Sequence, residues 1–224
     1  MGKIDDFEKR MILQGMSDAD ISEYEKLLKR VHGNFLKRQH CYTTAIQFPD
    51  KYSEQAVRLI NYGLESFPDG WFSTYSSYLY IGQIYERTGE YRKAYEAFLL
   101  AKEALGEDKN AYLQELSKEL MWMKLHIDAF CYSKELEEYY LCFSQSDEFS
   151  KAFLSSEFRT AVVNIIISLH YGRTDEAKSS LEKAKRMCKA DYKGRLYGLL
   201  KRHKYTETLK TTPEAMDFLN SVKI

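Results

Sequence analysis

The sequence predicts an all-α fold made of antiparallel helix hairpins. Along most of the 224 residues, apolar side chains recur at spacings of three and four, which is typical of amphipathic helices with one buried face. The chain has only three prolines, and no Asn-Gly or Asp-Gly dipeptide joins two alternating apolar runs as in a β-hairpin. The connections between the periodic segments are mostly short, as antiparallel neighbouring helices require.

Glycine, proline and capping residues set the limits of the expected helices. Gly15 ends the first helix, and the Ser17 hydroxyl is suited to cap the second by accepting a hydrogen bond from its first turn. Thr212 is suited to cap the last helix, because Pro213 then occupies the first helical position. The expected helices cover residues 3–14, 18–32, 34–47, 52–66, 71–88, 90–105, 110–131, 133–145, 148–171, 174–189, 191–203 and 213–222.

The composition is that of a globular protein without a broad charged surface. Apolar residues make up 44% of the chain and aromatic residues 14%, which is ample material for a core. Charged residues make up 29% and prolines number three, which excludes a disordered, low-complexity chain. Thirty-three basic residues are balanced by 33 acidic ones, so no nucleic-acid partner is expected, because binding to phosphates over a wide surface needs a basic excess.

The N-terminal residues and the cysteines favour a cytoplasmic protein. Asp5, Asp6 and Glu8 interrupt the apolar run that a secretory signal requires. The longest apolar runs are far shorter than the roughly 20 residues of a membrane-spanning helix, so no membrane partner is expected. No two of the four cysteines have the spacing of a Cys-x-x-Cys pair, and all four are expected to be buried free thiols. They are Cys41, Cys131, Cys142 and Cys188.

Motifs that carry chemistry are missing from the sequence. The five histidines form neither an HExxH motif nor a triad in a known order. No glycine-rich phosphate loop is present, and carboxylate pairs such as Glu137-Glu138 lie in polar stretches. We therefore expect no catalytic residue, no metal site and no cofactor, and a non-catalytic role. An enzyme on a helical scaffold is the least favoured class. It is kept as an alternative because a site assembled in space needs no local motif.

One segment combines small and aromatic residues in a pattern specific to crossing helices. Gly82 and Ala94 are small where two helices would cross closely, and Gly89 would end the first of them in a left-handed conformation. Aromatic residues on both sides would fill the space around the crossing. The pattern residues are Tyr78, Ile81, Gly82, Tyr85, Gly89, Tyr91, Ala94, Phe98 and Ala101. This segment resembles a tetratricopeptide repeat, with Gly106 where that repeat has its closing proline.

Two weaker copies of the pattern flank the central one. Upstream, Ala56, Ile60 and Gly63 precede Pro68 as in a second repeat helix; downstream, the run from Gly172 to Ala184 matches again. The resemblance implies hairpins stacked in a right-handed superhelix, with extra helices at both ends. The implied division is an N-terminal extension at 1–36, repeats at 37–191 and C-terminal capping helices at 192–224, all in a single structural unit.

The resemblance also implies a groove lined by the first helix of each hairpin. A peptide or partner helix would bind there, on an apolar surface that contains tyrosines. Cys41, Ala45, Leu79 and Gln83 stand where chaperone-binding members of the family hold a C-terminal carboxylate, which argues against that ligand. The implied partner-binding residues are Arg38, Tyr42, Ser76, Leu79, Tyr80, Gln83, Glu86, Arg87, Arg159, Val162, Ile166 and His170.

Three functions follow as hypotheses. The first is an adaptor that binds a protein or peptide in the groove. The second is a regulatory or toxin-neutralising protein that senses a peptide or sequesters one partner, and the third is the enzyme. A homodimer is a further possibility, because the apolar stretch Ala161 to Ile167 could be covered by a second copy.

Overall fold

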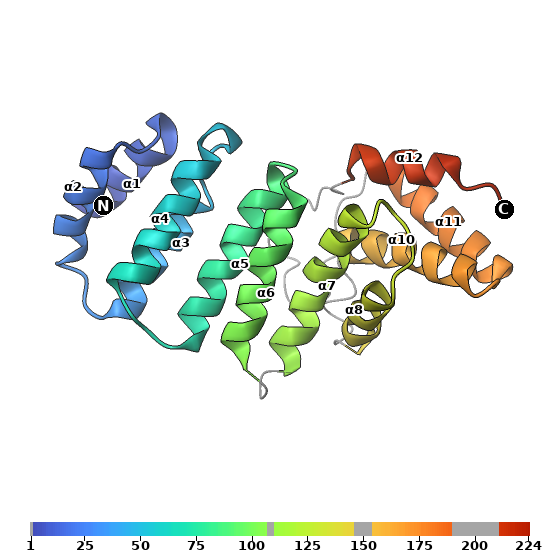
Figure 1. Cartoon of the computed structure of the whole chain (residues 1–224). Helices are drawn as coiled ribbons and strands as arrows, with labels where there is room; N and C mark the ends of the chain where they lie inside the picture. Colours follow the sequence, from blue (N-terminus) through green and yellow to red (C-terminus); the bar gives the residue numbers. More distant parts are fainter. Residues whose placement is uncertain (1, 107–109, 146–153, 190–210) are drawn as a thin grey trace, which may run out of the picture. The chain divides into compact units, whose positions relative to one another are not determined.

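The computed structural model of the chain describes residues 2–106, 110–145, 154–189 and 211–224 (Figure 1). Every regular element in these residues is helical, so the predicted all-α class is confirmed for the described part of the chain. The chain forms two compact units, residues Met1–Lys109 and Asn110–Ile224.

The first unit consists of three consecutive helix hairpins. Helices α1 and α2, α3 and α4, and α5 and α6 pack in pairs, while α3 also contacts α1 and α5, and α4 contacts α5 (Figure 1). The first helices of successive hairpins are therefore neighbours. The bounds are α1 Lys3–Gln14, α2 Asp18–Leu28, α3 Asn34–Ala45, a 3₁₀ turn Asp50–Tyr52, α4 Ser53–Ser66, α5 Trp71–Arg87 and α6 Tyr91–Leu105.

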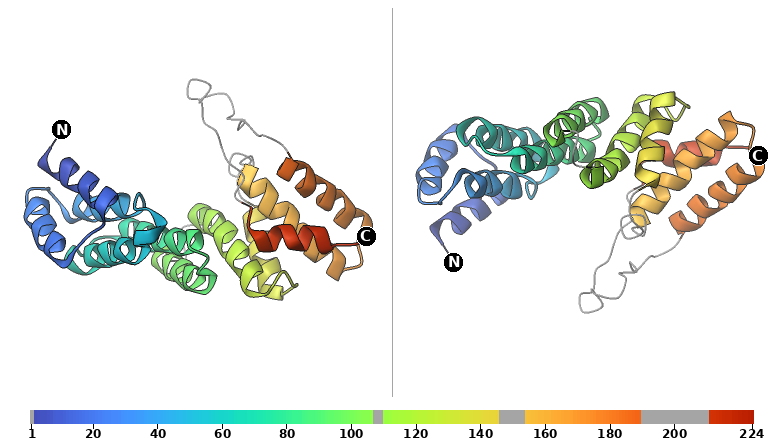
Figure 2. Two further views of the ribbon diagram at one scale, coloured as in Figure 1. Left: turned by 90° about the horizontal axis from the view of Figure 1, so that it is seen from above. Right: turned by 90° about the horizontal axis from the view of Figure 1, so that it is seen from below.

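The second unit contains two hairpins and a separate C-terminal helix. Helix α7 pairs with α8 and α10 with α11; α10 also contacts α7 and α8, and α12 packs on α11 (Figure 2). The bounds are α7 Asn110–Ile127, α8 Lys134–Ser144, α10 Leu154–His170, α11 Thr174–Lys189 and α12 Pro213–Ser221. The stretch Ala161 to Ile167, which raised the possibility of a homodimer, has its apolar side chains buried within this unit.

The expected helices agree with the observed ones except at a few ends. The predicted helix at 191–203 and the start of the one at 148–171 lie outside the described residues. Helix α2 ends at Leu28 rather than at residue 32, because the amides of Arg30 and Val31 bond three residues back instead of four. Helix α7 ends at Ile127 rather than 131, because Ala129 and Phe130 adopt positive φ angles of 50° and 60°.

The close helix crossing predicted at Gly82 is confirmed. A Cβ atom added to Gly82 in α5 would lie 2.3 Å from Cε1 of Phe98 in α6. The Phe98 ring is fully buried, so it occupies the space that a side chain at residue 82 would need. Gly89 has a φ of 76° after the end of α5, as expected for a left-handed helix terminus.

The same backbone turn ends α5, α7 and α10. In each case one amide bonds to the carbonyl three residues earlier, and the next amide bonds to the carbonyl five residues earlier, which is the Schellman motif. The donor–acceptor pairs are Gly89–Glu86 and Glu90–Tyr85, Ala129–His126 and Phe130–Leu125, and Gly172–Leu169 and Arg173–Ser168. Two of the turns place glycine in the left-handed position, and the third places Ala129 there.

We expect Ala129→Gly to raise the stability of the second unit by about 0.5–1 kcal/mol. A left-handed conformation costs a residue with a Cβ about 1–2 kcal/mol, and the greater entropy of glycine in the unfolded chain offsets part of the gain. Urea denaturation followed by the fluorescence of Trp122, which is buried in α7, measures the change. Gly172→Ala, the reverse exchange at the matching turn, should lower the stability of the second unit. A change in the free energy of unfolding with the same sign in both variants would contradict the explanation.

Candidate functional site

The predicted groove residues of the first unit lie along the contact between α3 and α5. We call this contact the α3–α5 seam. Successive pairs cross it in order along both helices, from the N-terminal ends to the C-terminal ends. The pairs are Phe35 with Phe72, Arg38 with Ser73 and Thr74, Tyr42 with Tyr80, and the carbonyl of Ile46 with Arg87.

Arg38 is a buried structural cation of the seam. Its Nη1 donates hydrogen bonds to Ser73 Oγ at 2.8 Å and to Thr74 Oγ1 at 2.7 Å, both in the first turn of α5. Its Nη2 donates to the carbonyl of Leu64 in α4 at 3.4 Å. Burial lowers the pKa of Arg38, while the nearby Asp69 carboxylate opposes that shift. One side chain thus joins three helices.

The two tyrosines at the centre of the seam stack on each other. The ring centroids of Tyr42 and Tyr80 are 5.3 Å apart with an angle of 23° between the planes. Tyr42 is buried, Tyr80 is half-buried, and Ser76 is buried. Burial raises the pKa of Tyr42, and the neighbouring Tyr80 adds to the shift. Of this central group, Tyr80 keeps the most surface for an outside ligand.

Arg87 at the far end of α5 caps α3. Its guanidinium donates to the carbonyl of Ile46 at 2.8 Å and to that of Phe48 at 3.0 Å, and it forms an ion pair with Asp50 at 3.1 Å. These carbonyls follow the last turn of α3, where helical partners are missing and a cation is favoured. The remaining predicted residues of α5, which are Leu79, Gln83 and Glu86, are half-buried.

An exposed aromatic cluster at the start of the seam was missed by the sequence analysis. Phe35, Trp71 and Phe72 are each about two-fifths exposed, as is the adjacent Leu36. Phe72 contacts both other rings, with centroids 6.3 Å from Phe35 and 5.6 Å from Trp71. The sequence signal for this cluster is two pairs of adjacent apolar residues, Phe35-Leu36 and Trp71-Phe72, at the starts of two helices. Adjacent residues of a helix point in different directions, so one residue of each pair must face outward.

The predicted residues of α10 belong to the second unit. Arg159, Val162 and Ile166 are buried, while His170 is exposed. Arg159 pairs with Glu119 at 2.6 Å and lies over the Trp122 ring. The His170 ring stacks on Tyr132 with a centroid distance of 3.5 Å. The first three side chains therefore contribute to packing between α10 and α7 or within the core of the unit, and His170 alone of the four faces outward.

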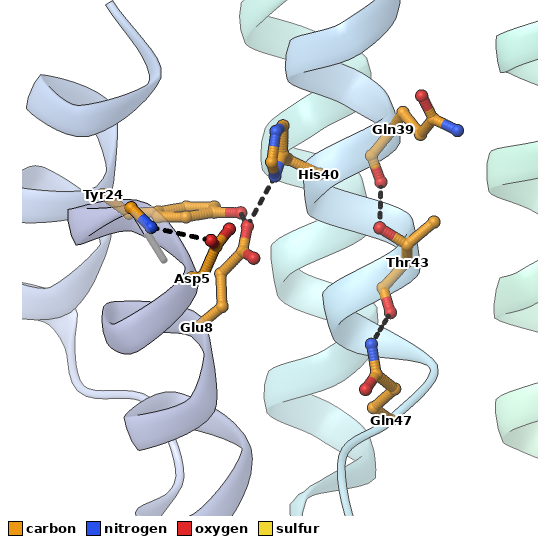
Figure 3. Close-up of polar contacts among 8 residues, drawn as sticks. Asp5, Glu8, Tyr24, Gln39, His40, Thr43 and Gln47 are labelled. Carbon is orange, nitrogen blue, oxygen red and sulfur yellow. Dashed lines mark hydrogen bonds and ion pairs between the residues drawn. The ribbon is translucent and has the colours of Figure 1, made fainter. Parts of the chain in front are cut away.

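A polar network joins the first three helices (Figure 3). One carboxylate oxygen of Glu8 in α1 accepts a hydrogen bond from the Tyr24 hydroxyl of α2 and lies 2.8 Å from His40 Nδ1 of α3. The hydrogen bond from His40 to Glu8 raises the pKa of the imidazole, although burial opposes this. Burial raises the pKa of Tyr24, so its phenol stays protonated and donates. The network fixes α1 to both neighbours.

We expect Glu8→Gln to lower the pKa of His40, because the variant removes the carboxylate charge and leaves the burial. An NMR titration of the His40 ring measures this pKa. The raised pKa means that the Glu8–His40 pair stabilises the wild type below about pH 6.5, and that this stabilisation is lost as the pH rises through the pKa of the folded state. Asp6→Asn, an exposed change in the same helix, is the control. An unchanged His40 titration in Glu8→Gln would contradict the pairing.

The described residues offer few groups for other chemistry. None of them forms a set of three or more His, Cys, Asp or Glu side chains placed to hold a metal ion. All four cysteines are free thiols, but the expectation that all are buried was wrong: Cys41 is buried, Cys142 and Cys188 are half-buried, and Cys131 is exposed. Cys131 lies in the turn after α7. Burial raises the pKa of Cys41 to about 12, so this thiol is unreactive.

No described helix combines the length and the apolar character needed to cross a membrane. The chain matches no protein-family model, no curated protein and no solved structure.

Proposed function

We propose that the protein is a non-catalytic adaptor that binds a protein or peptide on the α3–α5 seam. We further propose that its hairpins stack as in a tetratricopeptide-like superhelix. The contacts of α3 with both α1 and α5 support this arrangement, because stacked hairpins bring their first helices side by side. The seam is then part of the surface that such first helices present to a ligand.

The observation that carries the proposal is the exposed aromatic cluster at the start of the seam. Trp71, Phe72, Phe35 and Leu36 expose apolar area together, whereas single exposed apolar residues need no explanation. Tryptophan and other aromatic residues dominate the energy of protein interfaces when a partner buries them. Farther along the seam, the half-buried Tyr80 and Leu79 extend the surface on α5.

Arg38 and Arg87 give the proposed surface its rigidity. The Arg38 guanidinium joins α3 to α4 and α5, and the Arg87 guanidinium joins α5 to the segment after α3, so the helices that carry the aromatic side chains are held together before a ligand arrives. A surface that is ordered in advance loses less conformational entropy on binding. The proposed ligand is an apolar segment whose side chains cover the Trp71–Phe72 pair.

The experiment compares quantitative pull-downs from native lysate with three forms of the full chain. A partner that binds through the seam is retained by the wild type and lost by Trp71→Ser/Phe72→Ser. Glu96→Ser/Arg92→Ser, two exposed changes on α6, should retain it. The purified partner is then titrated against all three forms, and we expect at least a tenfold weaker Kd for the aromatic variant alone. Equal binding by all forms would place the function elsewhere.

A further inference from the structure

Helix α12 is amphipathic and is seated on the second unit by its apolar side. Ala215 and Leu219 are fully buried, and Met216 and Phe218 are half-buried beside them. The opposite side is exposed and polar, with Glu214, Asp217 and Asn220. The Thr212 hydroxyl accepts from the Ala215 amide and Pro213 begins the helix, so the nine-residue helix is capped at its N-terminus.

The surface beneath α12 is formed by α7, the turn after it, and α11. The Phe218 ring stacks on Phe130 with a centroid distance of 5.3 Å. His126 Nε2 lies 3.3 Å from the Thr212 hydroxyl, and the Cys188 thiol lies 3.6 Å from the Met216 sulfur. Burial lowers the pKa of His126 to about 4, so its ring is neutral at pH 7 and forms an uncharged hydrogen bond with the cap.

Helix α12 belongs to neither hairpin of the second unit and packs on their surface. A helix of nine residues is not stable by itself, so α12 forms because it is docked. It is joined to α11 by the 23 residues 190–212, so its removal breaks neither helix of the α10–α11 pair. Segments with few buried contacts open at lower free energy than the rest of a fold.

We propose that this surface of α7 and α11 is a binding site for an amphipathic helix of a partner protein, and that α12 is its resident occupant. The pattern of α12 defines the partner: a small residue, then an aromatic residue three positions later and leucine four positions later, with a hydroxyl residue at the cap. This is recognition of a helix in a groove. The proposal concerns the second unit and does not depend on the α3–α5 seam.

The docked helix α12 lowers the apparent affinity of the site for a partner helix. A helix on the same chain is present at its site at a higher effective concentration than a partner in dilute solution. A helix supplied from outside must compete with it, and the apparent affinity falls by the fraction of chains whose site is open. Weakening α12 within the chain should therefore strengthen the binding of an outside helix.

The experiment uses the full chain and a fluorescent synthetic peptide of residues 211–224. The peptide is titrated into the wild type and into the full chain with Phe218→Ala/Leu219→Ala, which removes apolar contacts of α12 only. We expect the peptide to bind the loosened variant at least ten times more tightly than the wild type. Asn220→Ala, an exposed change on α12, should behave as the wild type does.

A second change tests the surface itself. Adding Phe130→Ala to the loosened variant should weaken peptide binding at least tenfold, while circular dichroism confirms that the helices remain. Equal peptide affinity for the wild type and the loosened variant would overturn the proposal. A peptide affinity that is unchanged by Phe130→Ala would overturn it as well. A wild-type dimer that dissociates in the loosened variant would also overturn it, because the site would then serve a second copy of α12.

Discussion

Replacing Gly82 by alanine is expected to lower the free energy of unfolding by about 1–3 kcal/mol, the usual cost of overpacking a core. The new Cβ atom would lie 2.3, 2.5 and 2.7 Å from three carbon atoms of the Phe98 ring. No real carbon pair approaches so closely, so either the ring or the backbone of α5 must shift. The ring is enclosed in the core, and the shift therefore separates α5 from α6. Urea denaturation followed by circular dichroism measures the loss.

Two further variants test this mechanism. Gly70→Ser adds a side chain where nothing lies within 4 Å, and serine is a good residue at the start of a helix, so stability should be kept. Phe98→Leu in the Gly82→Ala background should recover part of the loss, because the smaller side chain vacates the space. If the changes in the free energy of unfolding caused by the two substitutions are additive in a double-mutant cycle, the Gly82–Phe98 contact is not the cause of the lost stability.

The second large effect is expected from Glu119→Gln in the second unit. Arg159 Nη1 lies 2.6 Å from Glu119 Oε2, and both side chains are more than four-fifths buried. Lys118 adds a second, longer ion pair at 3.4 Å. Without the carboxylate charge, the buried Arg159 guanidinium loses its ion pair with Glu119. Removing one partner of a buried pair costs about 3–5 kcal/mol, which Trp122 fluorescence during urea denaturation should reveal.

The same pair predicts a loss of stability in acid. Burial raises the pKa of Glu119, but Arg159 and Lys118 outweigh it and hold the value at about 2, below its usual 4.5. The pair therefore stabilises the folded state above pH 4.5, and this contribution is lost as the pH falls towards 2. Between pH 4.5 and 2, the free energy of unfolding should depend less on pH in Glu119→Gln than in the wild type.

A double substitution separates charge from shape at this position. Glu119→Leu/Arg159→Met removes both charges and keeps apolar bulk, and such replacements of buried ion pairs are close to neutral in stability. We expect it to recover most of the loss seen in Glu119→Gln. A double variant that is as unstable as the single one would show that packing, and not the loss of the Glu119–Arg159 ion pair, decides the effect.

The helices and their closest crossing were predictable because local residues determine them. Gly82 leaves room that only a neighbouring helix can fill, and Gly89 permits a conformation that other residues avoid. These are constraints within about 20 residues of sequence. The end of α7 was not predictable, because Ala129 and Phe130 adopt positive φ angles without glycine, and no residue type signals such a turn.

The candidate site was predicted only in part. The resemblance to a helical repeat implied that Arg38 and Tyr42 face a groove, but it did not show which helix packs on them. Both are buried against α5, whereas the sequence analysis assigned them to a ligand. Trp71 and Phe72 were not predicted as binding residues, because their exposure depends on what lies beyond the helix in space.

The turn that ends α5, α7 and α10 has a consequence for how such a chain changes over generations. Its two hydrogen bonds use backbone atoms alone, so the turn requires a residue that accepts a left-handed conformation more than it requires any particular side chain. Glycine meets that demand twice and Ala129 once. A chain can therefore keep these two hydrogen bonds while the side chains of the neighbouring turn residues change.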